Sequence, residues 1–193
     1  MEATDLWEFL SGDVVNVAPR LLGWHLATAF DGDTTEIVIT EVEAYRAAGD
    51  PASHAYRGLT RRTASMYEGA GPLYVYQSYG VHWCANVVTG SAGDASAVLI
   101  RGGRVVVGVD RMRERRGRSD HLVDGPGKLC AALGITGADD GSSLIDGPVR
   151  LVGDHPAGDF TIEATPRIGI SRATVRPWRF VARHGDGSSL APT

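Results

Sequence analysis

"GPLYVYQSYGVHWCANVV", residues 71–88, is the stretch of the sequence that most strongly predicts its fold. Apolar runs near 73–77 and 81–89 flank a Ser-Tyr-Gly turn, and this pattern predicts two neighbouring strands. The stretch carries three tyrosines, although the chain is only 7% aromatic. A strand that only fills a core would use Val, Ile or Leu. The hydroxyls therefore raise the question of a second role.

The three tyrosines differ in their expected surroundings. Side chains alternate along a strand, so Tyr74 and Tyr76 share one face of the sheet. Tyr79 precedes Gly80 in the turn, where a side chain projects outward. On this pattern alone, the simplest interpretation is a core strand whose hydroxyls reach the surface.

The rest of the chain supplies strands and helices that do not alternate regularly. β-branched and aromatic runs predict further strands, at 23–30, 35–45, 96–101, 148–153, 166–170 and 178–182. Caps and glycine stops predict helices, at about 4–10, 13–22, 109–117 and 125–134. An aperiodic loop follows at 46–62, with a helical turn near 64–68. We therefore predict an α+β fold, a single domain over 1–193 with a mixed, largely antiparallel curved sheet and packed helices.

Charge-free residues 69–93 raise the question of a membrane span. Pro72 and several polar residues interrupt this stretch, so a buried hairpin is favoured and no membrane association is expected. The first ten residues lack the features of a secretory signal. Cys84 and Cys130 form no CxxC pair, and the histidines have no metal-ligand spacing. We expect a cytoplasmic protein with no metal and no cofactor.

The net charge of −4 conceals an uneven distribution. Residues 1–44 carry −8, residues 45–118 carry +6, and residues 119–193 carry −2. DNA binding depends on the local field, so the basic middle third is compatible with a DNA partner. The run "RMRERRGR" at 111–118 could contact phosphates or could simply form a solvated helix face.

Two acidic residues and one histidine are candidates for chemistry. If Val42 faces the core, Glu41 and Glu43 point to the opposite face, where a carboxylate could activate water. On its own, such a glutamate is more often a solvent-facing sheet residue. His54 lies in a loop beside Tyr56, and a lone loop histidine is usually inert.

The joint arrangement of these residues gives the chain a recognisable pattern. "EVEAY" at 41–45, "DPASHAYRG" at 50–58, "LYVYQSYG" at 73–80 and "GPGKLCAALGI" at 125–135 occur in order. From about residue 20 to 182, the chain closely resembles the alkyladenine (3-methyladenine) DNA glycosylase family. The resemblance implies an enzyme that rotates a damaged purine out of duplex DNA into a pocket.

For the base, the resemblance implies a wedge and a pocket. Tyr79 would fill the gap left in the base stack. Tyr45 and Tyr76 would sandwich the extruded purine, with His54 completing the pocket. An aromatic face also attracts a base that alkylation has made cationic. Asn86 would stand where the exocyclic amino group of guanine would clash.

For the chemistry, the resemblance implies that Glu43 is the base that activates a water against C1′ of the sugar. Arg101 would hold that water or the adjacent phosphate. Lys128 is the only lysine, and it lies in the GPGKLC segment, so Schiff-base chemistry is not expected. A neutral lesion needs acid assistance, and the sequence names no donor. Weaker candidates for DNA backbone contacts are Arg57, Arg61, Arg62 and Lys128.

The expected function is that of a monomeric, monofunctional DNA glycosylase acting on double-stranded DNA. Its expected lesions are 3-methyladenine, 7-methylguanine, hypoxanthine and ethenoadenine, with an abasic site as product. The expected location is the nucleoid of a bacterial cytoplasm. Two alternatives remain open: a lesion-binding DNA module without catalysis, and a glycosylase specialised for bulky purine adducts.

The sequence departs from the family pattern at three places. Arg46-Ala47-Ala48 replaces the usual Leu-Gly-Pro, and Thr60-Arg61-Arg62-Thr63 replaces Thr-Pro-Arg-Asn. The polar Gln77-Ser78 precedes the wedge turn. These positions border the expected pocket or DNA surface, so they leave the substrate range open.

Overall fold

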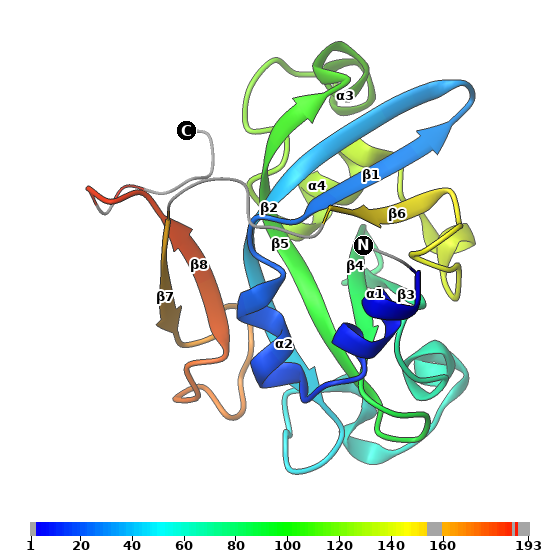
Figure 1. Cartoon of the computed structure of the whole chain (residues 1–193), viewed down its shortest axis with the longest axis vertical. Coiled ribbons are helices and arrows are strands. Elements are labelled where there is room, and N and C mark those ends of the chain that lie inside the picture. Colours follow the sequence, from blue (N-terminus) through cyan, green and yellow to red (C-terminus); the bar gives the residue numbers. More distant parts are fainter. Residues whose placement is uncertain (1–2, 154–159, 187, 189–193) are drawn as a thin grey trace.

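The computed structural model describes residues 3–153, 160–186 and 188, and it forms an eight-stranded sheet (Figure 1). The described strands are β1 (His25–Phe30), β2 (Asp33–Arg46), β3 (Leu73–Ser78), β4 (His82–Thr89), β5 (Ser96–Val107), β6 (Val149–Val152), β7 (Thr161–Thr165) and β8 (Arg179–Arg183). The strand order is β3-β4-β5-β2-β1-β6, while β8 pairs with β2 and carries β7 on its other edge. Every pair of named strands in the described chain is antiparallel.

Short helices complete the α+β fold. They are α1 (Ala3–Leu10), α2 (Val14–Arg20), α3 (Val109–Arg116) and α4 (Pro126–Leu133), with 3-10 helices η1 (His54–Arg57), η2 (Arg61–Tyr67) and η3 (Gly137–Asp139). The Asp13 carboxylate accepts from Val15 N–H and caps α2. Gly117, at φ 63°, ends α3 in the left-handed region. No helix in the described residues is long and apolar enough to cross a bilayer.

Most of the predicted elements are confirmed, including the α+β class and the hairpins β1–β2 and β3–β4. The strand predicted at 166–170 is wrong. This segment forms no strand because Arg167 turns its side chain into the interior and Gly169 adopts φ 74°. The strand that precedes this segment is β7, which pairs with the outer edge of β8. The segment expected as a loop at 46–62 contains η1 and the start of η2.

The long central strand β2 changes partner midway along its length. On one edge it pairs with β5 almost throughout. On the other edge it pairs with β1 up to Val38 and with β8 from Glu41 onward. Register shifts between β2 and β5 cluster around Glu41, opposite the glycines of β5. A Cβ at Gly103 would lie 2.6 Å from the Ile37 side chain, so this close approach needs glycine.

The two faces of the sheet have different neighbours. Val42, Ala44 and Ile100 have no exposed surface and belong to the main apolar core, which includes residues of α1, α2 and α4. Because side chains alternate, Glu43 and Tyr45 point to the opposite face. That face is the one on which η1, η2 and residues 168–172 gather around a cavity.

Candidate active site

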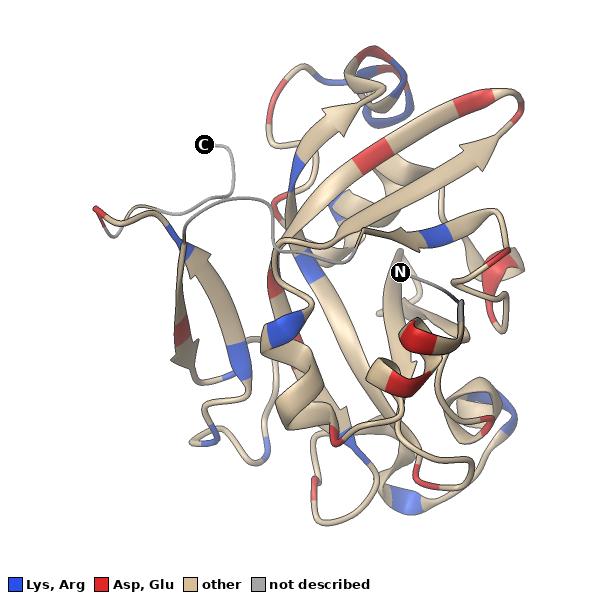
Figure 2. Ribbon diagram, in the orientation of Figure 1, with Lys and Arg blue, Asp and Glu red and all other residues tan. Residues whose placement is uncertain are grey.

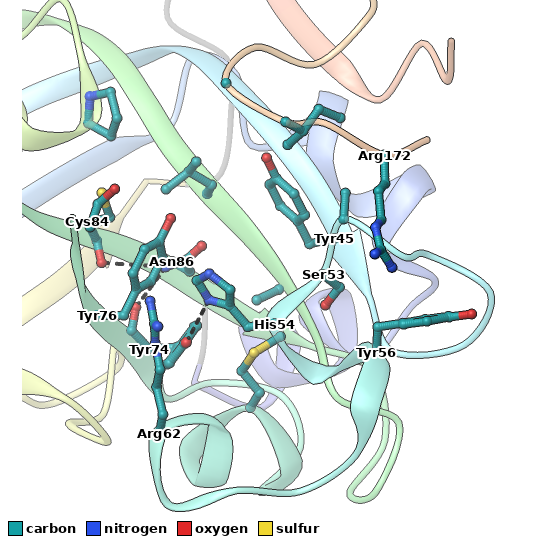
Figure 3. A pocket seen from close by; sticks show the side chains of 18 of the residues that line it. Tyr45, Ser53, His54, Tyr56, Arg62, Tyr74, Tyr76, Cys84, Asn86 and Arg172 are labelled. Atoms are coloured by element: carbon teal, nitrogen blue, oxygen red, sulfur yellow. Dashed lines mark hydrogen bonds between the residues drawn. The ribbon is translucent and has the colours of Figure 1, made fainter. Parts of the chain in front are cut away.

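A cavity of about 680 Å³ opens on the face of the sheet away from the main core (Figure 3). Its sheet wall consists of alternate residues of four strands: Tyr45, Tyr74, Tyr76, Ser78, Cys84, Asn86, Ala97, Leu99 and Arg101. The loop and 3-10 segments around His54, Arg62 and Ile168 form the remaining walls. The volume lies within the range of about 300–1,000 Å³ that is typical of small-ligand sites.

Aromatic rings form two sides of the cavity. On one side, Tyr76 stacks against Tyr74 with ring centroids 5.5 Å apart and planes inclined by 29°. The His54 ring meets Tyr76 edge-on, at 4.4 Å and 88°. Tyr45 lies across the cavity from this cluster (Figure 3). A flat aromatic ligand placed between the two sides would have a ring against each of its faces.

The tyrosine hydroxyls of this site are held in their neutral form. Burial raises the pKa of Tyr74 to about 12, against the opposing charge of Arg62. Burial, and then the neighbouring Glu43, raise the pKa of Tyr45. Burial likewise raises the pKa of Tyr76, which contacts Cys84. All three hydroxyls can therefore donate hydrogen bonds at neutral pH.

His54 is also neutral at physiological pH. Its Nδ1 lies 3.0 Å from the Tyr74 hydroxyl. Desolvation by the surrounding residues, and then the charge of Arg62, lower the pKa of His54 to about 4, although the ring is partly open to solvent through the cavity. When Tyr74 donates to Nδ1, the tautomer carries its proton on Nε2. That N–H is then free to donate to a ligand.

Glu43 lies directly below the cavity surface, not on it. Its Oε2 accepts from the Tyr45 hydroxyl at 2.6 Å and from Arg101 Nη1 at 3.4 Å. Its Oε1 accepts from the Ile168 backbone N–H at 2.7 Å. All three donor residues line the cavity, whereas the Glu43 side chain has no exposed surface. The carboxylate is therefore aligned by three donors and covered by them.

A second carboxylate shares the same arginine. Glu41 Oε1 accepts from Arg101 Nε at 2.9 Å and from Arg179 Nε at 2.6 Å. Burial opposes the ionisation of Glu41, but Arg179 and then Arg101 outweigh it and lower the Glu41 pKa. Arg101 thus bridges two carboxylates on the same face of β2 and presents its remaining surface to the cavity.

Tyr79 occupies a conformation that is costly for an aromatic residue. It sits in the three-residue turn between β3 and β4 with φ 51°, and 91% of its surface is exposed. A bulky residue in the left-handed region is uncommon, and such outliers concentrate at functional sites. The side chain also lines the rim of the cavity.

The charged residues that line the cavity are four arginines: Arg57, Arg62, Arg101 and Arg172. Among the described lining residues there is no carboxylate and no lysine. The Arg62 guanidinium lies 5.2 Å from the centre of the Tyr76 ring. The structure therefore gives this cavity a positive character, which suits an anionic backbone at its mouth.

The remaining sequence candidates lie near the cavity or beside it. Arg61 lines a second, more open hollow of about 390 Å³ next to the cavity. Tyr76 lines both hollows. Lys128 lies in the first turn of α4 and pairs with Asp124 at 3.0 Å. Asn86 is buried in the cavity wall, and its Nδ2 donates to the Tyr74 backbone oxygen at 3.0 Å.

Two of the departures from the family pattern have structural partners outside the cavity. Arg46 reaches Asp13 at 3.4 Å and stacks on Trp178. Thr60 and Thr63 form a capping box at the start of η2. In the residues that the structure describes, no cluster of three His, Cys, Asp or Glu side chains could hold a metal ion.

Sequence reasoning missed several contributors to the site. The period of two already placed Tyr74 beside Tyr76, but nothing local indicated its contact with His54. The segment at 166–172 supplies Arg167, the Ile168 N–H and Arg172. The sequence predicts a strand for its first part and leaves the rest unassigned. The Ile168 contact with Glu43 spans 125 residues of sequence, so no spacing rule could find it.

Comparison with known proteins agrees with this geometry. Residues 8–186 match the family described as Methylpurine-DNA glycosylase (MPG). The chain belongs to this family. The match covers both the strands that carry the cavity residues and the loop that supplies Ile168, and it confirms the family resemblance read from the sequence.

Individual relatives extend the match over nearly the whole chain. A Frankia casuarinae protein named "Putative 3-methyladenine DNA glycosylase" is 47% identical, covering 92% of this chain and 88% of the relative. A protein of the same name from Methanoculleus marisnigri is 46% identical, with 89% and 91% coverage. Another from Rhodopseudomonas palustris is 48% identical, with 91% and 85% coverage.

Proposed function

We propose that this protein is a monofunctional DNA glycosylase that releases damaged purines from double-stranded DNA and leaves an abasic site. The observation that supports this most is the position of Glu43. A carboxylate held by three donors lies directly under a cavity with aromatic sides, in a chain of the methylpurine-DNA glycosylase family. The protein would act as a monomer on chromosomal DNA in the cytoplasm.

Base capture follows from the aromatic sides and the turn. Tyr79 enters the duplex and replaces the stacking that the extruded nucleotide loses. The purine then lies between Tyr45 and Tyr76, and the His54 N–H donates to its edge. The substrates are 3-methyladenine, 7-methylguanine, hypoxanthine and ethenoadenine. The Asn86 wall disfavours the exocyclic amino group of guanine, and in 7-methylguanine the attraction of the cationic base to the aromatic faces offsets this effect.

Bond cleavage follows from the two charged groups below the cavity. As the glycosidic bond lengthens, its electrons pass to the base and C1′ becomes positively charged. The Glu43 carboxylate stabilises this charge and accepts a proton from the water whose oxygen bonds to C1′. A cationic alkylated base leaves in its neutral form, and a neutral lesion takes up a proton from solvent water as it leaves. The Tyr45 hydroxyl donates to Oε2 in the free protein and can stay in place, because the second lone pair of that oxygen, now facing Arg101, can take the proton of the water. The Arg101 contact with Glu43, at 3.4 Å, is the longest of the three, so this guanidinium nitrogen can turn to hold the water or the adjacent phosphate.

A single substitution tests the proposal. Duplexes with one hypoxanthine or one ethenoadenine, and alkylated DNA carrying 3-methyladenine and 7-methylguanine, are incubated with excess enzyme and then treated with alkali to cut abasic sites. We expect strand breaks with the wild type and a loss of at least about 10²-fold in rate with Glu43→Gln. Glu163→Gln is the matched control, because Glu163 is an exposed residue paired with Arg183 on β7 and β8. Its rate should equal that of the wild type.

One observation favours a second candidate, a lesion-binding module without catalysis. The Glu43 side chain is fully covered, as a purely structural carboxylate would be. That candidate predicts tight, lesion-specific binding and no strand breaks from either wild type or Glu43→Gln. Release of large adducts with little release of methylated bases would instead identify the bulky-adduct specialist.

A further inference from the structure

A buried ion pair lies beneath the cavity, outside the set of residues that line it. Arg167 Nη1 and Nη2 each donate to an oxygen of Asp50 at 2.7 Å. Neither side chain has exposed surface. Arg167 Nη1 also donates to the Ala44 backbone oxygen at 2.9 Å. The pair therefore joins the segment before β8, the loop after β2 and the end of β2 itself.

The pair contacts the back of the Tyr45 ring. The Arg167 guanidinium carbon lies 4.6 Å from the centre of that ring and 5.1 Å from the centre of the Trp178 ring. Tyr45 lines the cavity, whereas Arg167 does not and is fully buried. The guanidinium therefore covers the face of Tyr45 that points away from the cavity, and stacking of this kind restricts rotation of the ring.

The pair also lies next to the donor that contacts Glu43. Ile168 follows Arg167 directly, and its N–H donates to Glu43 Oε1 at 2.7 Å. The peptide that carries this N–H is thus anchored by the side chain immediately before it. On the other side of the pair, Asp50 accepts from the Ala52 N–H, and its backbone oxygen accepts from Ser53 N–H at the start of η1, which carries His54.

Stability alone does not account for such a pair. Desolvating two charges costs several kcal/mol each, and replacing a buried pair by apolar residues is often neutral or stabilising. Arg167 Nε adds to the cost, because it is buried without a partner in the described structure. What the pair supplies, and an apolar contact would not, is a fixed direction for the groups attached to it.

We propose that the Arg167–Asp50 pair is a positioning device, which holds the Ile168 N–H on the Glu43 carboxylate and fixes the Tyr45 ring for base capture. The inference rests on the proposed function, because it assigns the pair to the same reaction. Arg167 and Asp50 touch no reacting atom. They act through Ile168, Tyr45 and the turn that leads to His54.

The decisive variant removes both charges together. Arg167→Met combined with Asp50→Leu leaves no unpaired buried charge, so thermal unfolding should remain close to that of the wild type. The rate of hypoxanthine release at saturating enzyme should nevertheless fall by about 10²-fold, since displacements near 1 Å have effects of that size. A folded double variant with the wild-type rate overturns the proposal.

A conservative variant keeps the test valid if the double variant does not fold. Arg167→Lys retains the charge and one contact with Asp50 but loses the planar fork. It should fold and release hypoxanthine more slowly than the wild type, by less than about 10²-fold, and a wild-type rate would overturn the proposal. The matched control is Arg176→Met, which removes another arginine that ties the same two loops, through Gly49 O at 2.8 Å and Trp178. Among the described residues Arg176 forms no hydrogen bond, ion pair or ring stacking with Tyr45 or Asp50, and its loss should leave the rate unchanged.

Coupling to Glu43 separates positioning from a general structural role. Groups that act as a unit are not additive, so Arg167→Lys should cost only a few-fold at most in a Glu43→Gln background. Equal losses in both backgrounds would overturn the proposal. The two proposals also fail differently. A fully active Glu43→Gln protein refutes the catalytic role of Glu43. If Glu43→Gln is inactive but the Arg167 variants release the base at the wild-type rate, only the positioning role is refuted.

Discussion

Two arginine-rich regions of the molecule differ in what their guanidinium groups contact. At the cavity mouth, Arg57 and Arg172 have no hydrogen bond or ion pair within the described residues. In and around α3, Arg111 pairs with Asp33 and Glu114, Arg113 with Asp110, and Arg118 with Asp120. Figure 2 shows this mixture of blue and red on and beside α3.

The difference shows that the density of arginine along a sequence does not identify a DNA-binding surface. The run at 111–118 has the highest density, yet Arg111, Arg113 and Arg118, three of its five arginines, already have acidic partners. Arg57 and Arg172, which have no such partner among the described residues, come from separate segments and meet at the cavity. Free guanidinium donors are available to phosphate, whereas paired ones must first give up a partner. This contrast supports the solvated-face alternative for α3.

The largest effect on DNA binding is expected at Tyr79, in the turn between β3 and β4. Tyr79→Ser removes a ring that is 91% exposed and makes no core contact. Loss of aromatic stacking worth about 1–3 kcal/mol should weaken binding to a hypoxanthine duplex by about 5- to 150-fold. Thermal unfolding should stay unchanged. Unaltered affinity and single-turnover rate would contradict the role of Tyr79 as a wedge.

A smaller effect separates the two arginine regions directly. Arg57→Ala and Arg172→Ala should each reduce the slope of log affinity against log salt by about 1, for damaged and undamaged duplexes alike. Arg113→Ala and Arg118→Ala are the matched variants in the α3 region, and they should leave that slope unchanged. The comparison fails if the α3 variants lower the slope as much as the cavity variants do. Binding titrations between low and physiological salt measure both.

The smallest expected effect is a shift in pH dependence. Desolvation, and then the charge of Arg62, lower the pKa of His54 to about 4, so His54 stays neutral down to mildly acidic pH. Arg62→Met removes that charge, and the pKa of His54 should rise toward its ordinary value of 6.5. Protonated His54 repels a cationic base. As the pH is lowered, the affinity for a 7-methylguanine duplex should therefore begin to fall at a higher pH in the variant than in the wild type. Identical pH profiles would show that Arg62 does not act on His54.

The sequence predicted the parts of the site that depend on local periodicity. Alternation in β2 and β3 placed Glu41 with Glu43, and Tyr74 with Tyr76, and turn chemistry placed Tyr79 at a tip. The segment 166–170 misled because its isoleucines alternate with Gly169, which imitates a short strand. In the fold, burial of the Arg167–Asp50 pair determines its path instead.

Contacts between distant segments could not be predicted in this way. The partner change of β2 depends on which strand reaches its second edge, and the pairing of β8 with residues 41–43 is set by tertiary packing. The cover over Glu43 likewise arises only when residues from β2, β5 and the loop before β8 meet. The resemblance to a family supplied their roles, and the structure supplied their mutual geometry.

The alternation of the sheet has a consequence for how substitutions should be tolerated. Along 41–45 and 97–101, odd-numbered residues reach the cavity or the carboxylates below it, while Val42, Ala44, Val98 and Ile100 fill the core. If every position is substituted, changes at even-numbered positions should lower cellular abundance, and changes at odd-numbered positions should lower the rate of base release. Inserting one residue before position 41 would exchange the two sets within β2 and abolish both properties at once.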